Sequence, residues 1–345
     1  MFMQGTNTSF YLIGLCSFLT SLCLTPFVRQ LAIRFNIMDH PSSHIKSHRQ
    51  ATPYLGGLAI TLGIIGGLAT ALAIPHFMVF SEWAVFLLPL LALFSLGVLD
   101  DIYNYSARFR FLIQSVIFLI TMMSTKLQIP ITGWPVFDFF FTLIWLVGIT
   151  NAFNIIDIMD GLSAGVAIMI SIFLAILAIQ KNIALVMFFT FMITGSTFGF
   201  IGFNFSKTKK IFMGDGGSTL LGGFLGIVAV IFCQSSEHSL VDFVSLLILF
   251  GIPIYDTFLV MILRLKNGDS PFKGSRDHFA LRMVQMGFSS TTTVISAYVV
   301  TLALGLISFV ISHFNDHLHS FLLLSAVLLL GITWGRMLSI INVRG

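Results

Sequence analysis

Long apolar stretches separated by short polar intervals fill the chain from end to end. A helix needs about 20 predominantly apolar residues to cross a bilayer, and about eleven such stretches occur here. They lie near residues 9–28, 54–74, 83–99, 109–125, 137–153, 162–180, 183–202, 217–234, 239–263, 288–312 and 318–340. The pattern predicts an all-α, polytopic integral membrane protein with about 11 transmembrane helices, folded as one transmembrane domain over residues 1–345.

Composition supports this class. Of the 345 residues, 57% are hydrophobic and 9% are charged, whereas soluble domains carry about a quarter charged residues. Cys16, Cys23 and Cys233 all fall within apolar stretches, where we expect packing residues rather than redox or metal chemistry.

The basic residues predict the orientation. Cytoplasmic loops of membrane proteins hold an excess of Lys and Arg. If the amino terminus is outside, only Lys126 and Lys181 of the 18 Lys and Arg residues lie outside as well. We therefore expect a cytoplasmic carboxyl terminus, and the net charge of +4 then reflects contact with anionic lipid and substrates, not nucleic acid.

The segment 151–162 places two amides and two acids, each three residues apart, at the edge of an apolar stretch. They are Asn151, Asn154, Asp157 and Asp160, followed by Gly161. Acids in membrane helices are costly and usually functional. On a straight helix this spacing spirals over about half the circumference, so the groups would converge better if the helix unwinds near Gly161. Helix caps and interhelical hydrogen bonds are the alternative, which explains the amides better than the acids.

A second acidic segment ends the third apolar stretch. Asp100 and Asp101 are adjacent, and Asn104, Arg108 and Arg110 follow. Adjacent side chains point in different directions on a helix, so one acid could hold a metal and the other a substrate proton. A helix end with arginines reaching toward the membrane surface is the alternative.

A glycine-rich segment, 212–218, precedes the eighth stretch. Backbone N–H groups at a helix start suit phosphate. Asp215 would repel bare phosphate but could bind it through Mg²⁺, and Phe212 could stack on a base. Close helix packing is the alternative for the glycines, Gly214 included.

Two further loops are rich in basic residues. The first has Lys46, His48 and the pair Gly56 and Gly57; the last has Arg276, His278 and Arg282, preceded by Asp256, for which we expect a supporting role. Such cations could bind phosphates, although any loop on the positive side of a membrane would look similar.

Together, these segments resemble the polyprenyl-phosphate N-acetylhexosamine-1-phosphate transferases. The ordered set carries the resemblance: Lys46-x-His48 with Thr52-Pro53-x-x-Gly56-Gly57, then Asp100-Asp101-x-x-Asn104, Asn151-Ala-Phe-Asn154-x-x-Asp157-x-x-Asp160-Gly161-Leu162, and Phe212-Met-Gly214-Asp215-x-Gly217-Ser218. The last loop lacks the consecutive histidines of the phospho-MurNAc-pentapeptide branch, so the chain is more similar to the undecaprenyl-phosphate GlcNAc-1-phosphate transferases.

The resemblance implies a reaction. A polyprenyl phosphate, such as undecaprenyl phosphate, attacks the β-phosphorus of a UDP-N-acetylhexosamine and releases UMP, as a first step of cell-wall, lipopolysaccharide or O-antigen synthesis. It implies Mg²⁺, with Mn²⁺ as a substitute, a multi-pass location in the bacterial cytoplasmic (inner) membrane among its lipids, a site facing the cytoplasm, and a chain that could pair as a homodimer.

The same resemblance assigns roles to the residues. Asp215 would hold the metal with Asp160 or Asp101, while Asp100 would keep the attacking phosphate deprotonated. The remaining residues would order the metal and the UDP-sugar or bind phosphates: Asp157, Asn104, Asn151, Asn154, Phe212, Gly214, Lys46, His48, Arg276, His278 and Arg282.

Three features depart from the family pattern. Ala280 and Leu281 replace two histidines, the loop containing Lys207 to Lys210 is one residue longer and lacks Pro-Ala, and Ile158 replaces a common glycine. A weakened relative that acts only in lipid binding or assembly is therefore an alternative. A cation-coupled transporter is another, but it predicts polar groups at mid-membrane rather than at helix ends.

Overall fold

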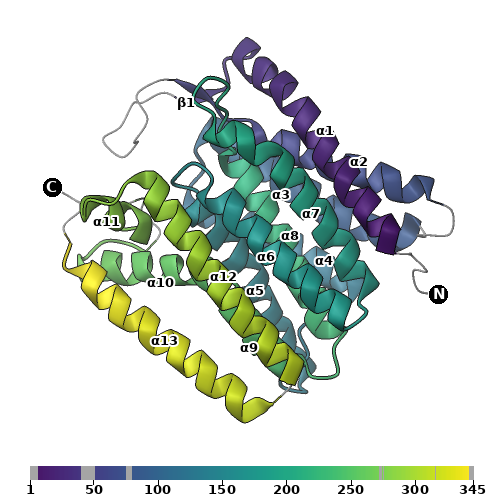
Figure 1. The fold of residues 1–345 in the computed structure, drawn as a ribbon, viewed down its shortest axis with the longest axis vertical. Coiled ribbons are helices and arrows are strands. Elements are labelled where there is room, and N and C mark those ends of the chain that lie inside the picture. The colour runs from purple at the N-terminus through teal and green to yellow at the C-terminus, as the bar shows by residue number, and fades with distance from the viewer. Residues whose placement is uncertain are drawn as a thin grey trace.

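The computed structural model describes residues 7–39, 51–74, 80–271, 274, 276–314 and 316–341. Within these residues the chain is almost wholly helical (Figure 1). The helices are α1 (Asn7–Arg34), α2 (Gly56–Ala73), α3 (Phe80–Tyr103), α4 (Ala107–Thr125), α5 (Pro135–Ile156), α6 (Leu162–Gln180), α7 (Ala184–Phe205), α8 (Gly214–Gln234), α9 (Ser239–Leu249), α10 (Gly251–Lys266), α11 (Phe279–Gln285), α12 (Ser290–Phe314) and α13 (His317–Ser339).

The number of spans agrees with the sequence. Ten helices are long and apolar enough to cross a membrane, or eleven if the bent pair α9 and α10 forms one span. The all-α, polytopic class is confirmed. The described cysteines Cys16, Cys23 and Cys233 lie in α1 and α8 as free thiols.

One expected span is wrong in detail. Residues 239–263 form two helices, α9 and α10, bent by 68° at Phe250. Pro253 lies at the start of α10 and has no backbone N–H to donate into the preceding turn, which favours a bend there.

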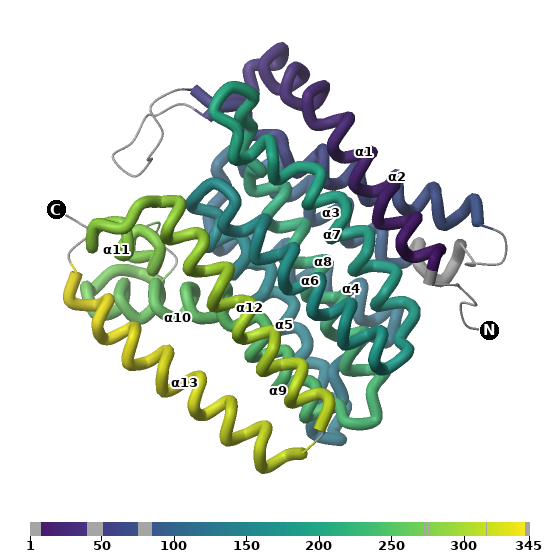
Figure 2. The backbone as a smooth tube through the Cα atoms, in the orientation of Figure 1, coloured from purple at the N-terminus to yellow at the C-terminus, as the bar shows by residue number. Residues whose placement is uncertain are grey.

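Helix α8 lies at the centre of the bundle. The apolar stretch of this helix is completely buried, as expected for a helix that is hydrophobic on all sides. Glycines allow this close packing: a Cβ on Gly222 would lie 2.9 Å from the carbonyl oxygen of Ile149 on α5. Figure 2 shows α8 enclosed by its neighbours, while α13 lies along the edge of the molecule.

The bundle has two unlike ends. We call the end where α1, α3, α5 and α7 finish and α2, α4, α6 and α8 begin the polar end. A short antiparallel pair, β1 (Met38–Asp39) with β2 (Thr52–Pro53), also lies there. Among the described Lys and Arg residues, only Lys126 and Lys181 follow helices that finish at the opposite end. This is the predicted division of charge; that the polar end faces the cytoplasm stays a prediction.

Candidate active site

The turn between α5 and α6 carries two of the predicted acids. Helix α5 ends at Ile156, and the backbone turns at Gly161, whose φ is +75°. Neighbouring helices fix this turn at both backbone atoms: Gly161 N–H donates to Asn204 Oδ1 (2.6 Å), and Tyr298 Oη donates to the Gly161 carbonyl (2.5 Å). The predicted unwinding is confirmed, and Gly161 supplies it although Ile158 stands where a glycine was expected.

The glycine-rich segment also begins a helix, as predicted. Gly214 has φ +75° and Asp215 lies in the first turn of α8. The preceding backbone is bonded to the β2–α2 connection: Phe212 N donates to Pro53 O (2.8 Å), Gly56 N to Phe212 O (2.9 Å) and Gly57 N to Met213 O (2.8 Å). Two segments far apart in sequence therefore form one backbone unit.

The end of α3 meets the same helix start. Gly97 packs directly against the Asp215 carbonyl, which a Cβ at position 97 would overlap. Asp101 Oδ2 accepts from the backbone N of Gly216 (3.4 Å). Asp101 thus places a carboxyl group at the start of α8, whose backbone N–H groups attract an anion.

Asp100 is held by two groups beyond the end of α3. Its Oδ1 accepts from Tyr105 N (2.8 Å) and its Oδ2 from Arg110 Nη1 (2.5 Å). The same Nη1 lies 3.1 Å from Asp215 Oδ2. Arg110 therefore bridges two acids that are 115 positions apart in the sequence.

The asparagines of α5 serve interhelical packing. Asn151 Nδ2 donates to Gln114 Oε1 on α4 (2.6 Å), and Asn154 Nδ2 donates to Ser218 Oγ on α8 (3.1 Å). The alternative of interhelical hydrogen bonds thus describes both amides. Asn154 still borders the acids, because Ser218 is three residues from Asp215.

The acids influence one another electrostatically. Burial raises the pKa of Asp157 well above its ordinary value, and the negative charges of Asp215 and Asp160 raise it further. Asp160 has its own cation, Lys210, whose Nζ lies 2.6 Å from Asp160 Oδ2 and 4.9 Å from the centre of the Phe212 ring. Five acids from three parts of the chain therefore converge at the polar end.

The acids fit a hard divalent cation in part. Across the described ranges, no three His, Cys, Asp or Glu side chains lie together as the ligands of one ion. Mg²⁺ needs fewer protein ligands, since it uses one or two carboxylates with substrate phosphates and waters. Asp101 and Asp215 fit that description: Asp215 lies in the first turn of α8, the Asp101 carboxylate contacts the same turn from α3, and the two charges repel each other.

The last loop is arranged differently from the expectation. His278 Nδ1 bonds to Asp256 Oδ2 (2.8 Å), and Phe279 N donates to Asp256 Oδ1 (2.8 Å). Arg282 is buried and donates to Asp277 Oδ1 (2.7 Å) and to the carbonyls of Leu338 and Ile341 at the end of α13. Arg282 thus joins α11 to α13, which does not favour it as a direct phosphate ligand. Asp256 has the supporting place that we expected.

The other predicted residues have varied places. Lys46 and His48 lie outside the described residues. Asn104 is exposed, with a left-handed backbone (φ +51°) that ends α3, and Arg276 is half-buried between α10 and α11.

Sequence reasoning missed four residues. They are Arg110, Lys210, Asn204 and Tyr298, each bonded to an acid or to the Gly161 turn. Their only signal was position: Arg110 follows Asp100 by ten residues and Lys210 precedes Phe212 by two. The positive-inside pattern explained both cations equally well, so neither drew attention.

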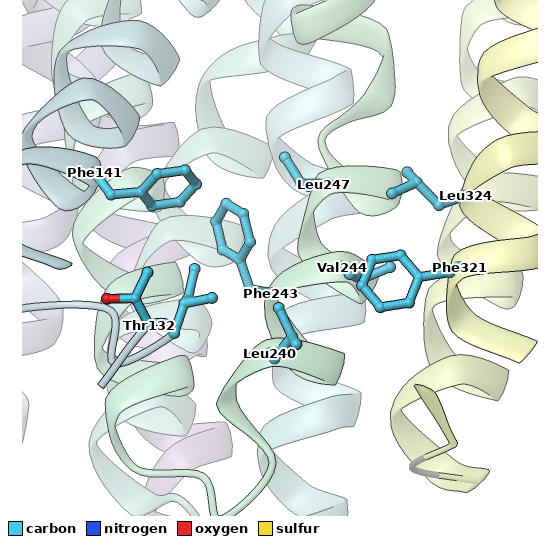
Figure 3. A pocket seen from close by; sticks show the side chains of 9 residues that line it. Thr132, Phe141, Leu240, Phe243, Val244, Leu247, Phe321 and Leu324 are labelled. Carbon is cyan, nitrogen blue, oxygen red and sulfur yellow. The ribbon is translucent and has the colours of Figure 1, made fainter. Parts of the chain in front are cut away.

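An apolar pocket lies away from these acids. It has a volume of about 210 Å³ and is lined by Ile131, Thr132, Phe141, Leu240, Phe243, Val244, Leu247, Phe321 and Leu324. Figure 3 shows Phe141, Phe243 and Phe321 around it, from α5, α9 and α13. With a single hydroxyl and no charge, it offers no chemistry for phosphate transfer.

Comparison with known proteins identifies the family of this chain. Residues 83–233 match the model of glycosyl transferase family 4. A Bacillus subtilis (strain 168) protein named "Probable undecaprenyl-phosphate N-acetylglucosaminyl 1-phosphate transferase" is 33% identical over 296 residues, which are 82% of this chain and 80% of that protein. The chain belongs to glycosyl transferase family 4.

More distant members of family 4 cover the chain as fully. An undecaprenyl-phosphate alpha-N-acetylglucosaminyl 1-phosphate transferase of Yersinia pestis is 28% identical over 85% of this chain and 81% of its own length. A decaprenyl-phosphate N-acetylglucosaminephosphotransferase of Mycolicibacterium smegmatis is 28% identical over 86% and 80%. The family 4 match includes α4 to α7 and the acids Asp100, Asp101, Asp157, Asp160 and Asp215.

Proposed function

We propose that this protein transfers an N-acetylhexosamine 1-phosphate, with GlcNAc as the first candidate sugar, from its UDP derivative to a polyprenyl phosphate such as undecaprenyl phosphate. The products are UMP and a polyprenyl diphosphate sugar. One observation carries the proposal: five acids converge at the polar end, beside the loop of Phe212 and the start of α8. The names of the family 4 relatives supply the substrate class.

The metal-binding residues in this proposal are Asp215 and Asp101, with Asp160 close by. Mg²⁺, or Mn²⁺ in its place, would neutralise the diphosphate of the UDP-sugar when bound there. Phosphoryl transfer leaves little covalent work to the protein, so positioning and charge are its main contribution.

Asp100 is the acid that we assign to the attacking lipid phosphate. It lies in the last turn of α3, a helix long and apolar enough to cross a membrane, and therefore near the level of the lipid headgroups. Around it, α3 and α4 expose apolar side chains that suit a polyprenyl chain, among them Leu99, Ile102, Phe109 and Leu112. The Asp100 carboxylate would keep the phosphate deprotonated for its attack on the β-phosphorus.

The UDP-sugar would bind along the Phe212 loop. We assign base stacking to Phe212 and phosphate contacts to the backbone N–H groups that follow Gly214, because a helix start attracts anions. Asp157 and Asn154 would order the sugar side of the site. Lys46, His48, Arg276 and His278 stay candidates for the outer phosphates, whereas Arg282 would position the last loop.

Location follows from the same assignment. A cytosolic UDP-sugar requires the polar end to face the cytoplasm, so we propose the bacterial cytoplasmic membrane and an outside amino terminus. Association as a homodimer is part of the proposal and rests on no described contact.

A second candidate is a relative that binds lipid without catalysis. Ala280 favours it, because this residue is completely buried where the family has a histidine. That candidate predicts binding of polyprenyl phosphate without release of UMP.

The test is UMP release by purified protein in detergent, with undecaprenyl phosphate, a panel of UDP-sugars, and either Mg²⁺ or excess EDTA. We expect metal-dependent release with one N-acetylhexosamine. The Asp215→Asn variant should lose about a hundred- to a thousandfold in turnover, the size of effect seen when one group that stabilises the transition state is removed. Glu237→Gln, an exposed acid, is the control. Normal turnover by a folded Asp215→Asn protein would contradict the metal assignment.

A further inference from the structure

Three of the site's carboxylates, Asp100, Asp215 and Asp160, already have cations of the protein's own. Arg110 Nη1 lies 2.5 Å from Asp100 Oδ2 and 3.1 Å from Asp215 Oδ2, and Lys210 Nζ lies 2.6 Å from Asp160 Oδ2. Both basic side chains are about a quarter exposed (25% and 28%), so water screens these pairs only partly. Three acids assigned to metal and phosphate thereby share two cations of the chain itself.

Arg110 is incompletely satisfied in this position. Among the described residues its Nε is buried and has no hydrogen-bond partner. A guanidinium has five donors arranged to match a phosphate or carboxylate in pairs. Arg110 therefore keeps a buried donor available for a further anion beside Asp100.

Lys210 has a neighbour that points to the same use. Its Nζ lies 4.9 Å from the centre of Phe212, the ring assigned to the base of the UDP-sugar. Its backbone is tied down separately, because the Lys210 carbonyl accepts from Arg29 Nε (3.1 Å). The long side chain can thus change partner without moving the loop.

A divalent cation and these basic groups compete for the same carboxylate oxygens. Asp215 Oδ2 cannot bind a metal and keep a full ion pair with Arg110, because the two positive charges would repel each other across a few ångströms. A displaced guanidinium or ammonium needs another anion, and phosphate is the anion that both groups bind well.

We propose that Arg110 and Lys210 are exchangeable counter-ions: in the metal-free protein Arg110 pairs with Asp100 and Asp215 and Lys210 pairs with Asp160, and metal binding transfers both cations to the phosphates of the two substrates. This rests on the proposed function for the identity of the phosphates only. The competition with metal requires no substrate.

A permanent structural role makes the opposite prediction. If the two cations only hold the acids in place, their removal misplaces the ligands and weakens metal binding. If they are exchangeable, their removal frees the ligands and strengthens it. The sign of the change in metal affinity therefore separates the two roles.

The experiment is titration of the purified full-length protein with Mn²⁺ alone, followed by electron paramagnetic resonance, without any substrate. Arg110→Gln and Lys210→Gln should each bind Mn²⁺ about three- to tenfold more tightly than the unmodified protein, the size of effect expected from a half-buried ion pair. Both should also melt at lower temperature in EDTA, with the loss restored by Mn²⁺.

The controls remove the same charge nearby. Arg108 and Lys209 are exposed neighbours of the two residues, and Arg108→Gln and Lys209→Gln should leave Mn²⁺ affinity unchanged. Arg110→Lys keeps the charge and should keep the original affinity. If Arg110→Gln does not fold, Lys210→Gln gives the sign of the affinity change by itself.

Turnover gives the second half of the test. At saturating metal, Arg110→Gln should release UMP at least about tenfold more slowly, so that affinity and rate change in opposite directions. Weaker or unchanged Mn²⁺ binding by folded Arg110→Gln and Lys210→Gln proteins would overturn the proposal. Tighter Mn²⁺ binding without UMP release by the unmodified protein would uphold the counter-ions and contradict the proposed function instead.

Discussion

The folded protein favours the protonated form of Asp157. Its pKa is raised above the unfolded value by burial first and by Asp215 and Asp160 next. For such a group, the folded protein binds the proton more tightly than the unfolded protein does. Stability is therefore lost as the pH rises through the folded pKa.

This sign gives a prediction for Asp157→Asn, which cannot ionise. In EDTA the variant should gain melting temperature over the unmodified protein at pH 8 and gain less at pH 5. Thermal melting in detergent at both pH values measures the difference. The exposed Glu237→Gln should produce no such pH dependence, and an equal gain for Asp157→Asn at both pH values would contradict the prediction.

At the scale of elements, the close packing of α3 on the start of α8 sets the position of Asp215. A Cβ on Gly97 would meet the Asp215 backbone, which cannot yield as a side chain can. We expect Gly97→Ala to destabilise the protein by about 1–3 kcal/mol, the usual effect of overpacking, and to slow UMP release by displacing Asp215.

Gly202 provides the matched control. It is also a helical glycine, but a Cβ added there would have no atom of another residue within 4 Å, and alanine favours helix over glycine by about 1 kcal/mol. Gly202→Ala should therefore melt at the same temperature or higher. If both variants melt alike, the close approach of α3 and α8 is not what positions Asp215.

The sequence predicted helices better than it predicted side-chain partners. Apolar length alone located the spans, because a bilayer demands it, and within the described residues one expected span is broken, near Pro253. The acids were found because charge in a membrane helix is exceptional. Arg110 and Lys210 were not, because cations at this end of a membrane protein are ordinary, and only distance reveals which acid each one faces.

At the scale of the whole molecule, an ion pair fastens the end opposite the acids. Lys181 Nζ lies 2.6 Å from Asp242 Oδ2, and Ser312 Oγ donates to Asp242 Oδ1 (2.6 Å). Asp242 is completely buried. These three residues join the ends of α6, α9 and α12, which lie next to one another in Figure 1.

Lys181→Met should leave Asp242 buried without its cation and cost about 3–5 kcal/mol of stability. Unfolding in detergent measures this, and the folded fraction should release UMP normally because the acids lie at the other end. Lys126→Met, a change at the same end, should have little effect. The double variant Lys181→Met with Asp242→Leu should recover most of the lost stability. If it does not, the stability lost in Lys181→Met comes from packing and not from the unpaired charge.

Asn204 has a consequence for how the chain tolerates change in length. Its amide accepts from Gly161 and also donates to the Ile211 carbonyl (3.1 Å), so one side chain holds both ends of the loop 206–210, which follows α7. An added residue in such a loop costs little closure entropy and bulges toward solvent. A change of one residue in length near Lys207 to Lys210 can therefore be absorbed without shifting Phe212 or Asp215. By the same reasoning, related chains can vary the length of this loop while the acids before and after it keep their positions in the site.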